Sequence, residues 1–347
     1  MQPRTRLLPL ALAALLAGCG AGATDPSGSA TGSGAPPSPT PPPSDRFAYE
    51  PGSVGPATLA PQAVLEDGTT IQDLSYPGPS GGAVSAWLVT PPGDGPFAGM
   101  LYLHGSETDR DDLLDEAMAM ATGGVASIVL DAPWVRDGEA RGSEAGNYFA
   151  PEEEVAMMEQ IVTDLRAGID VLVRDGKADP ERIGFMGHSW GASTGAILAA
   201  VDDRPIAFAL VTGRPSWTDF LRSEAEGRLA SIVSMIGQEK WEAYLAALAP
   251  FDAVAQIGAA DGQELLLQFG TADDVVTPDA VEAFTAAAPD GTTVQTFDAG
   301  HVLDGEATAA RIAWLAERLG ADPIAPEAVE RVGLPDAPTA VPVTTGG

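Results

Sequence analysis

The hydrophobic and polar positions of this chain follow two periodicities in turn, and they predict strands that alternate with helices. Short apolar runs rich in β-branched and aromatic residues, bounded by Pro and Gly, predict strands at 71–76, 83–90, 97–103, 125–130, 206–211, 263–269 and 292–297. Apolar residues spaced by three and four predict helices at 111–121, 152–173 and 306–319. This alternation predicts an α/β fold, with a mostly parallel central sheet and helices on both faces.

One stretch breaks the alternation. Residues 216–250 hold two predicted helical stretches with apolar residues, among them Trp217, Trp241 and Tyr244, and no strand between them. The stretch is either a helical insertion that covers a site or a pair of ordinary helices packed on the sheet edge, because apolar residues at helical spacing are first of all core residues.

A candidate nucleophile lies between an apolar run at 182–186 and a run of small residues at 192–200. The pentapeptide Gly187-His188-Ser189-Trp190-Gly191 reads G-x-S-x-G. A strand, a sharp turn and a helix in this order expose a serine hydroxyl at the apex of the turn. The two glycines fit because side chains there would crowd the bend. The alternative is a serine that only caps the helix.

The histidines narrow the choice of a general base, since the chain has three: His104, His188 and His301. His188 adjoins the serine, and its side chain is expected to point away from the nucleophile. His104 precedes a glycine at the end of a predicted strand, where we expect it to shape the following loop through hydrogen bonds. His301 therefore remains as the base that takes the proton from Ser189.

A carboxylate is also needed to hold the imidazole in the correct tautomer. Asp273 and Asp274 follow the predicted strand at 263–269, and either could serve, since Asp favours turns at strand ends. The order Ser189, Asp273, His301 is the serine–acid–histidine order of α/β-hydrolases.

Residues from about 64 to 319 resemble an α/β-hydrolase of the dienelactone-hydrolase and prolyl-oligopeptidase-like branch. The likeness is carried by the segments at 101–105, 178–191, 269–273 and 298–301. One departure is Gly191-Ala192, where relatives often have two glycines. The resemblance implies acyl transfer by a Ser189–His301–Asp273 triad, and its spacing of the acid three residues after Gly270 selects Asp273 over Asp274.

The resemblance also implies an oxyanion hole and a covered pocket. One backbone donor would be the N–H of Trp190, and the other would come from the loop after His104-Gly105, at Ser106. Relatives often carry a cap at the position of 216–250, so we expect Trp217, together with Trp134 and Tyr148 from the loop at 131–151, to line the substrate pocket.

The N-terminal residues predict export. Arg4 and Arg6 precede an apolar run at 7–17 that is too short to span a bilayer. Cys19, the single cysteine, ends the lipobox-like Leu16-Ala17-Gly18-Cys19, which implies lipid attachment and anchoring to the bacterial cell envelope, outside the cytoplasm. The alternative is an ordinary secretory signal.

These boundaries divide the chain into four parts. We predict a lipoprotein signal peptide at 1–18, a Gly/Ser/Pro-rich tether at 19–46, a hydrolase domain at 47–320 with a cap at 216–250, and a loosely ordered Pro-rich tail at 321–347.

Charge excludes one class of partner. The chain has 18 Lys and Arg against 49 Asp and Glu, a formal net charge of −31, so a nucleic-acid-binding face is excluded. The sequence holds no metal-ligand or phosphate-binding motif, and the acidic run at 109–116 is expected to be a solvated helix start, so we expect no metal and no cofactor. A monomer is the default expectation.

Three functions fit these observations. The first is a lipid-anchored carboxylic-ester hydrolase acting on a small-molecule or lipid ester. The second is a serine peptidase or amidase of the prolyl-oligopeptidase kind, against which stands the lack of room for a large N-terminal propeller in the sequence. The third is a non-catalytic binding lipoprotein, against which stands the presence of all three triad residues.

Overall fold

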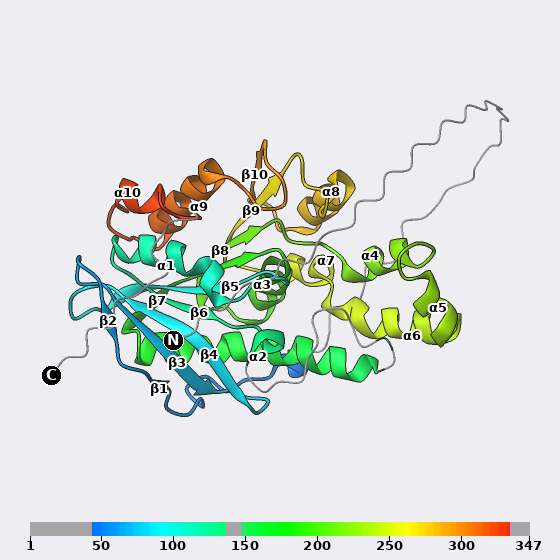
Figure 1. Cartoon of the computed structure of the whole chain (residues 1–347), viewed down its shortest axis with the longest axis horizontal. Helices are drawn as coiled ribbons and strands as arrows, with labels where there is room; N and C mark the ends of the chain where they lie inside the picture. Colours follow the sequence, from blue (N-terminus) through cyan, green and yellow to red (C-terminus); the bar gives the residue numbers. More distant parts are fainter. Residues whose placement is uncertain (1–43, 137–147, 149, 334–347) are drawn as a thin grey trace, which may run out of the picture. The chain divides into compact units, whose positions relative to one another are not determined.

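The computed structural model describes residues 44–136, 148 and 150–333 of the 347-residue chain (Figure 1). The predicted signal peptide, the lipidation site at Cys19, the tether up to residue 43 and the last part of the tail, 334–347, lie outside the described residues.

The described residues form one mixed sheet in the strand order β1-β3-β4-β6-β5-β7-β8-β9-β10, with β2 paired to β3. Neighbouring strands from β6 to β10 are parallel, and β1, β2, β3 and β4 pair antiparallel. The strands are β1 Thr58–Leu59, β2 Ala63–Val64, β3 Thr70–Pro77, β4 Ala83–Thr90, β5 Phe97–Leu103, β6 Val125–Leu130, β7 Ala178–His188, β8 Pro205–Val211, β9 Glu264–Gly270 and β10 Thr293–Phe297.

Helices cover both faces of this sheet, as Figure 1 shows. One buried cluster joins the sheet to α2 and α3, and a second joins its other face to α1, α9 and α10. The α-helices are α1 Leu114–Ala121, α2 Pro151–Arg174, α3 Trp190–Val201, α4 Trp217–Glu224, α5 Ala230–Ile236, α6 Gln238–Leu248, α7 Ala253–Gln256, α8 Pro278–Ala287, α9 Gly305–Arg318 and α10 Pro326–Val329. The predicted fold class is confirmed.

The central strands are apolar because both of their faces are covered. Every residue of β5 is buried, and β5 pairs in parallel with β6 on one side and β7 on the other. The carboxyl ends of parallel strands meet at one edge of a sheet, so the loops after β5, β7, β8, β9 and β10 converge there.

The predicted elements match closely where the apolar runs are sharply bounded. The strands at 83–90, 97–103 and 125–130 coincide with β4, β5 and β6. The predicted helix at 111–121 begins instead as a 3₁₀ turn, Arg110–Leu113, before α1. α8 was not predicted, and Phe284 is its one fully buried side chain, so its apolar periodicity is weak.

The stretch 216–250 holds three helices, α4, α5 and α6, where two were predicted. They have their own apolar cluster around Trp241, Tyr244 and Leu248, and α6 packs on α2. The buried Asp252 anchors the start of α4, because its carboxylate accepts the N–H of Trp217 at 2.7 Å and the hydroxyl of Ser216 at 2.9 Å.

The predicted loose tail from residue 321 is wrong for residues 321–333, which pack against α1. The N–H of Asp322 donates to the Gly123 carbonyl at 2.9 Å, and the N–H of Ala325 donates to the Thr122 hydroxyl at 3.0 Å. Ala328 of α10 is buried. The proline content that suggested disorder includes Pro326, which instead begins a helix, as proline can at the first helical position. None of the described helices has the length and apolar character needed to cross a membrane.

Candidate active site

The turn between β7 and α3 holds Ser189 in a strained backbone conformation. Its φ of 53° and ψ of −112° are unusual for a residue with a side chain. The flanking glycines allow the bend, because a Cβ on Gly187 would lie 2.3 Å from the Gly191 carbonyl oxygen, and one on Gly191 would lie 2.1 Å from that of Leu103. The Ser189 hydroxyl caps nothing in α3, which argues against a merely capping serine.

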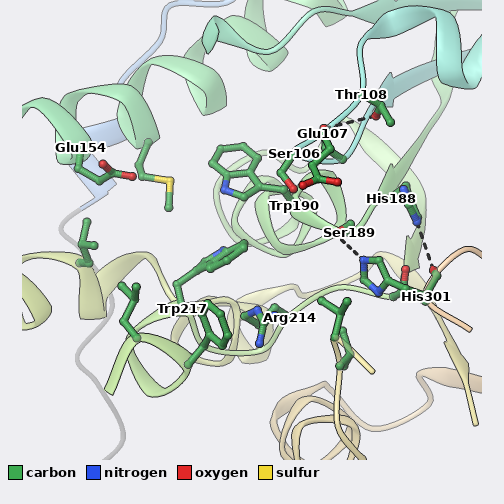
Figure 2. A pocket seen from close by; sticks show the side chains of 18 of the residues that line it. Ser106, Glu107, Thr108, Glu154, His188, Ser189, Trp190, Arg214, Trp217 and His301 are labelled. Atoms are coloured by element: carbon green, nitrogen blue, oxygen red, sulfur yellow. Dashed lines mark hydrogen bonds between the residues drawn. The ribbon is translucent and has the colours of Figure 1, made fainter. Parts of the chain in front are cut away.

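Ser189, His301 and Asp273 form a continuous hydrogen-bonded chain. His301 Nε2 lies 2.8 Å from Ser189 Oγ, the contact drawn in Figure 2. His301 Nδ1 lies 2.9 Å from Asp273 Oδ2. Because a carboxylate can only accept, Nδ1 carries the proton and Nε2 is left free to accept the serine proton.

Asp273 is fixed for this task by the loop after β9. Its other oxygen, Oδ1, accepts the N–H groups of Val275 at 2.7 Å and Val276 at 2.9 Å. The Asp273 side chain is 1% exposed. Asp274, the alternative acid, is exposed and lies outside this network. The geometry therefore selects Asp273 as the partner of His301.

The two residues predicted to supply the oxyanion donors, Trp190 and Ser106, line the same cavity as Ser189. Trp190 is the first residue of α3, and N–H groups in the first turn of a helix have no partner within it. Ser106, after β5, lines the cavity that contains Ser189. The loop after β5 lies close to the nucleophile at Gly105, the residue before Ser106. A Cβ on Gly105 would lie 3.3 Å from Ser189 Cβ and 3.2 Å from His188 Nδ1.

Gly105→Ala should therefore push the loop after β5 away from the nucleophile. We expect kcat/KM for hydrolysis to fall at least about tenfold, because small displacements at a reacting centre are costly. The control is Gly305→Ala, where an added Cβ meets nothing within 4 Å. Equal rates for the two variants would contradict a close fit of this loop against Ser189.

His104 fixes the same loop from within the core. It is fully buried, its Nε2 accepts the N–H of Ala132 at 3.0 Å, and its Nδ1 donates to the Gly105 carbonyl at 2.6 Å. Burial lowers the pKa of His104, which favours this neutral form. The expectation that His104 shapes the loop through hydrogen bonds is confirmed.

His188 lies next to the hydrogen-bonded residues Ser189, His301 and Asp273 but is not part of that network. Its Nε2 is 3.4 Å from the His301 carbonyl oxygen, and its Nδ1 is buried without a partner. Burial is the main cause and the neighbouring His301 the second cause that together lower the pKa of His188 to about 4. His188 is therefore neutral at pH 7.

This neutral histidine predicts an acid-sensitive stability. An ordinary His pKa is 6.5, so between pH 6.5 and about 4 the unfolded chain binds more protons at His188 than the folded chain. Stability is therefore lost as pH falls through this window. We expect the drop in Tm between pH 7 and pH 4.5 to be about 3 °C smaller in His188→Gln, which cannot protonate. Equal drops in Tm for the wild type and His188→Gln, measured by calorimetry, would contradict this prediction.

Ser189 opens into a cavity of about 580 Å³, within the size range of small-molecule sites. Of the three predicted pocket residues, Tyr148 and Trp217 line it. Trp134 does not: it is buried behind the wall, edge-on to Trp190 at 4.5 Å between ring centroids. The prediction failed because the loop after β6 turns Trp134 back into the core.

The helical insertion forms one wall of this cavity. Trp217, Phe220 and Leu221 of α4, with Tyr244 and Leu248 of α6, face the same space as Ser189. This is the arrangement expected of a cap rather than of helices on a distant sheet edge. In the part of the chain that the structure describes, no group of three or more His, Cys, Asp or Glu side chains is placed to hold a metal ion.

Sequence reasoning missed four charged residues of the cavity: Glu107, Glu154, Arg214 and Arg228. Arg214 had a usable signal, since it follows an apolar strand that ends beside the nucleophile turn. Nothing in the local sequence around Glu107, Glu154 and Arg228 separates them from ordinary surface residues.

Comparisons with known proteins agree with this fold. No curated protein sequence matches the chain. An acetyl xylan esterase from a Paenibacillus species has a TM-score of 0.63 at 18% identity, over 79% of this chain and 90% of that one. Acetyl xylan esterase 1 from a Thermoanaerobacterium species has a TM-score of 0.64 at 16% identity, over 81% and 95%. A protein described as a dienelactone hydrolase from Klebsiella pneumoniae has a TM-score of 0.52 at 16% identity, over 73% and 98%.

The family is given by a match to the sequence itself. The profile of the prolyl oligopeptidase family matches residues 139–320, which is more than half of the 347 residues. This segment contains Ser189, Asp273 and His301. The chain belongs to the prolyl oligopeptidase family, within the α/β-hydrolases.

Proposed function

We propose that this serine hydrolase cleaves carboxylic esters through an acyl-enzyme formed on Ser189. The single observation that carries the proposal is the hydrogen-bonded chain from Ser189 through His301 to Asp273, which opens into a cavity. Each distance lies within the range for proton transfer between a nucleophile, its base and an orienting acid.

The reaction runs in two balanced steps. His301 Nε2 takes the proton of Ser189 as Oγ attacks the ester carbonyl, and it returns that proton to the departing alcohol. Asp273 stabilises the imidazolium formed between these transfers. A water molecule then gives a proton to His301 and attacks the acyl-enzyme, and His301 passes this proton to Ser189 Oγ as the acyl–oxygen bond breaks and the acid leaves. The oxyanion of each tetrahedral intermediate would accept the N–H groups of Trp190 and Ser106.

The substrate class we favour is a small ester. Two of the structural relatives bear the name acetyl xylan esterase, and the cavity has the volume of a small-molecule site. The test is turnover of 4-nitrophenyl esters from acetate to palmitate by a soluble form that begins near Ser44. We expect turnover that depends on Ser189 and declines for long acyl chains. If none of the esters is turned over in a Ser189-dependent way, the proposal is contradicted.

A second candidate is peptide cleavage, which membership of the prolyl oligopeptidase family favours. Ester and amide hydrolysis use the same triad, so the site alone does not separate them. A set of peptidyl 4-nitroanilides, with proline and other residues before the scissile bond, distinguishes the two. A kcat/KM for any of these amides above that of the best ester would make the peptidase function the better description.

We also propose that the enzyme is exported and anchored through a lipid on Cys19. This proposal rests on the sequence of the first 19 residues. Expression of the full chain beside Cys19→Ser, followed by membrane fractionation and mass spectrometry of the N-terminal peptide, tests it. Equal distribution of the two forms, with no acylated peptide, would favour an ordinary secretory signal.

A further inference from the structure

Arg214 holds a fixed position beside the nucleophile. It lies three residues after the end of β8, and β8 neighbours β7, the strand that leads to Ser189. The hydroxyl of Ser193, on the first turns of α3, accepts the Arg214 N–H at 3.0 Å and donates to its carbonyl at 2.8 Å. The backbone of Arg214 is thus tied to the helix that Ser189 begins.

The guanidinium of Arg214 has aromatic neighbours but no direct ion-pair partner among the described residues, and the charges of Asp273 and Glu224 act on it only from a distance. It lies 3.9 Å from the ring centroid of Phe220 and 5.1 Å from that of Trp217, and Figure 2 shows it beside Trp217 on the Ser189 side of the cavity. Among the described residues no carboxylate pairs with it, and its Nε is buried without a hydrogen-bond partner. Burial lowers its pKa to about 10, so it remains charged at neutral pH.

The surroundings of the Arg214 guanidinium leave its hydrogen bonding incomplete. Aromatic faces stabilise the plane of a guanidinium, but its N–H groups point outward along the edge and still need acceptors. The Nε–H of Arg214 is buried without an acceptor, and an unpaired buried donor on a cation costs free energy. A carboxylate fits the fork of a guanidinium with two parallel hydrogen bonds and would remove this cost.

The other charges of the cavity do not supply that partner. Glu107 is exposed and lies across the cavity beside Ser106, and Glu154 lies at its far end in Figure 2. Arg228 is already paired with Glu224 at 3.3 Å and is exposed. With a net charge of −31 the protein as a whole repels anions, so an anionic substrate would need a dedicated cation near the triad.

We propose that Arg214 binds a carboxylate of the substrate, so that the enzyme prefers esters with an anionic group over neutral esters of the same shape. This inference rests on the proposed ester hydrolysis and names its substrate class.

The test compares two matched pairs of probes. Mono-4-nitrophenyl adipate and 4-nitrophenyl hexanoate differ by a carboxylate on the acyl side. The pair 4-acetoxybenzoate and methyl 4-acetoxybenzoate differs on the alcohol side. Each is assayed with the wild type, with Arg214→Met and with the control Arg222→Met, an exposed arginine of α4 that pairs with Asp219. The Ser189→Ala rate is subtracted throughout.

We expect the anionic-to-neutral ratio of kcat/KM to fall at least about tenfold in Arg214→Met for one of the pairs, and to be unchanged in Arg222→Met. Unchanged ratios for both pairs, or an equal loss on the anionic and neutral probes, would overturn the inference and leave Arg214 a packing residue. If no probe shows serine-dependent turnover, the proposed function fails instead. Calorimetric binding of adipate to the wild type and to Arg214→Met then decides the inference, which is overturned if both bind adipate alike or not at all.

Discussion

Ser189→Ala should abolish ester turnover, with a fall in kcat of at least about 10⁴-fold. The substitution removes the oxygen that lies 2.8 Å from His301 Nε2 and leaves the Cβ and the strained turn in place. No other hydroxyl has a hydrogen bond to His301 among the described residues, so no neighbouring serine can replace it. The measurement is kcat on the best 4-nitrophenyl ester, together with labelling by a serine-directed phosphonate.

Ser223→Ala is the matched control, because Ser223 is an exposed serine of α4 whose hydroxyl donates to the Phe220 carbonyl. We expect it to retain activity and labelling. Labelling of Ser189→Ala at the wild-type rate would show that the phosphonate reacts elsewhere. Ester turnover that survives the substitution would contradict an acyl-enzyme on Ser189.

The triad could be proposed from the sequence because each member follows a strand with a clear boundary. Ser189 is marked by its two glycines, and His301 was selected because the other two histidines adjoin glycines near the turn and the oxyanion loop. The choice between Asp273 and Asp274 could not be made from the residues alone. It depends on the turn at 273–276, where two backbone N–H groups fix the Asp273 side chain and leave Asp274 in solvent.

The walls of the cavity were less predictable, because they depend on how loops and inserted helices pack. Trp134 and Trp217 look alike in sequence, as aromatic residues that follow strands, yet one packs against Trp190 inside the core and the other faces the cavity. Arg214 is a similar case. Its position after β8 is local information, but its surroundings are the aromatic side chains that α4 brings to it, and among the described residues no carboxylate forms an ion pair with it.

The hydrogen bonds around Asp273 predict an unusually specific effect of Asp273→Asn. Oδ1 accepts two backbone N–H groups, from Val275 and Val276, so the asparagine oxygen must occupy that position. Its NH₂ group is then directed at His301 Nδ1, which must become an acceptor. The proton of the neutral imidazole moves to Nε2, and Nε2 can no longer accept the proton of Ser189.

We therefore expect kcat to fall by about 10³–10⁴-fold in Asp273→Asn while Tm changes little, since the shape and the backbone contacts of the side chain are kept. Asp274→Asn is the control, and its activity should match the wild type because Asp274 is exposed. ¹⁵N NMR of the His301 side chain tests the cause directly: neutral His301 should carry its proton on Nδ1 in the wild type and on Nε2 in the variant. A loss of activity with the wild-type tautomer retained would mean that the carboxylate acts through its charge, by stabilising the imidazolium, rather than by setting the proton's position.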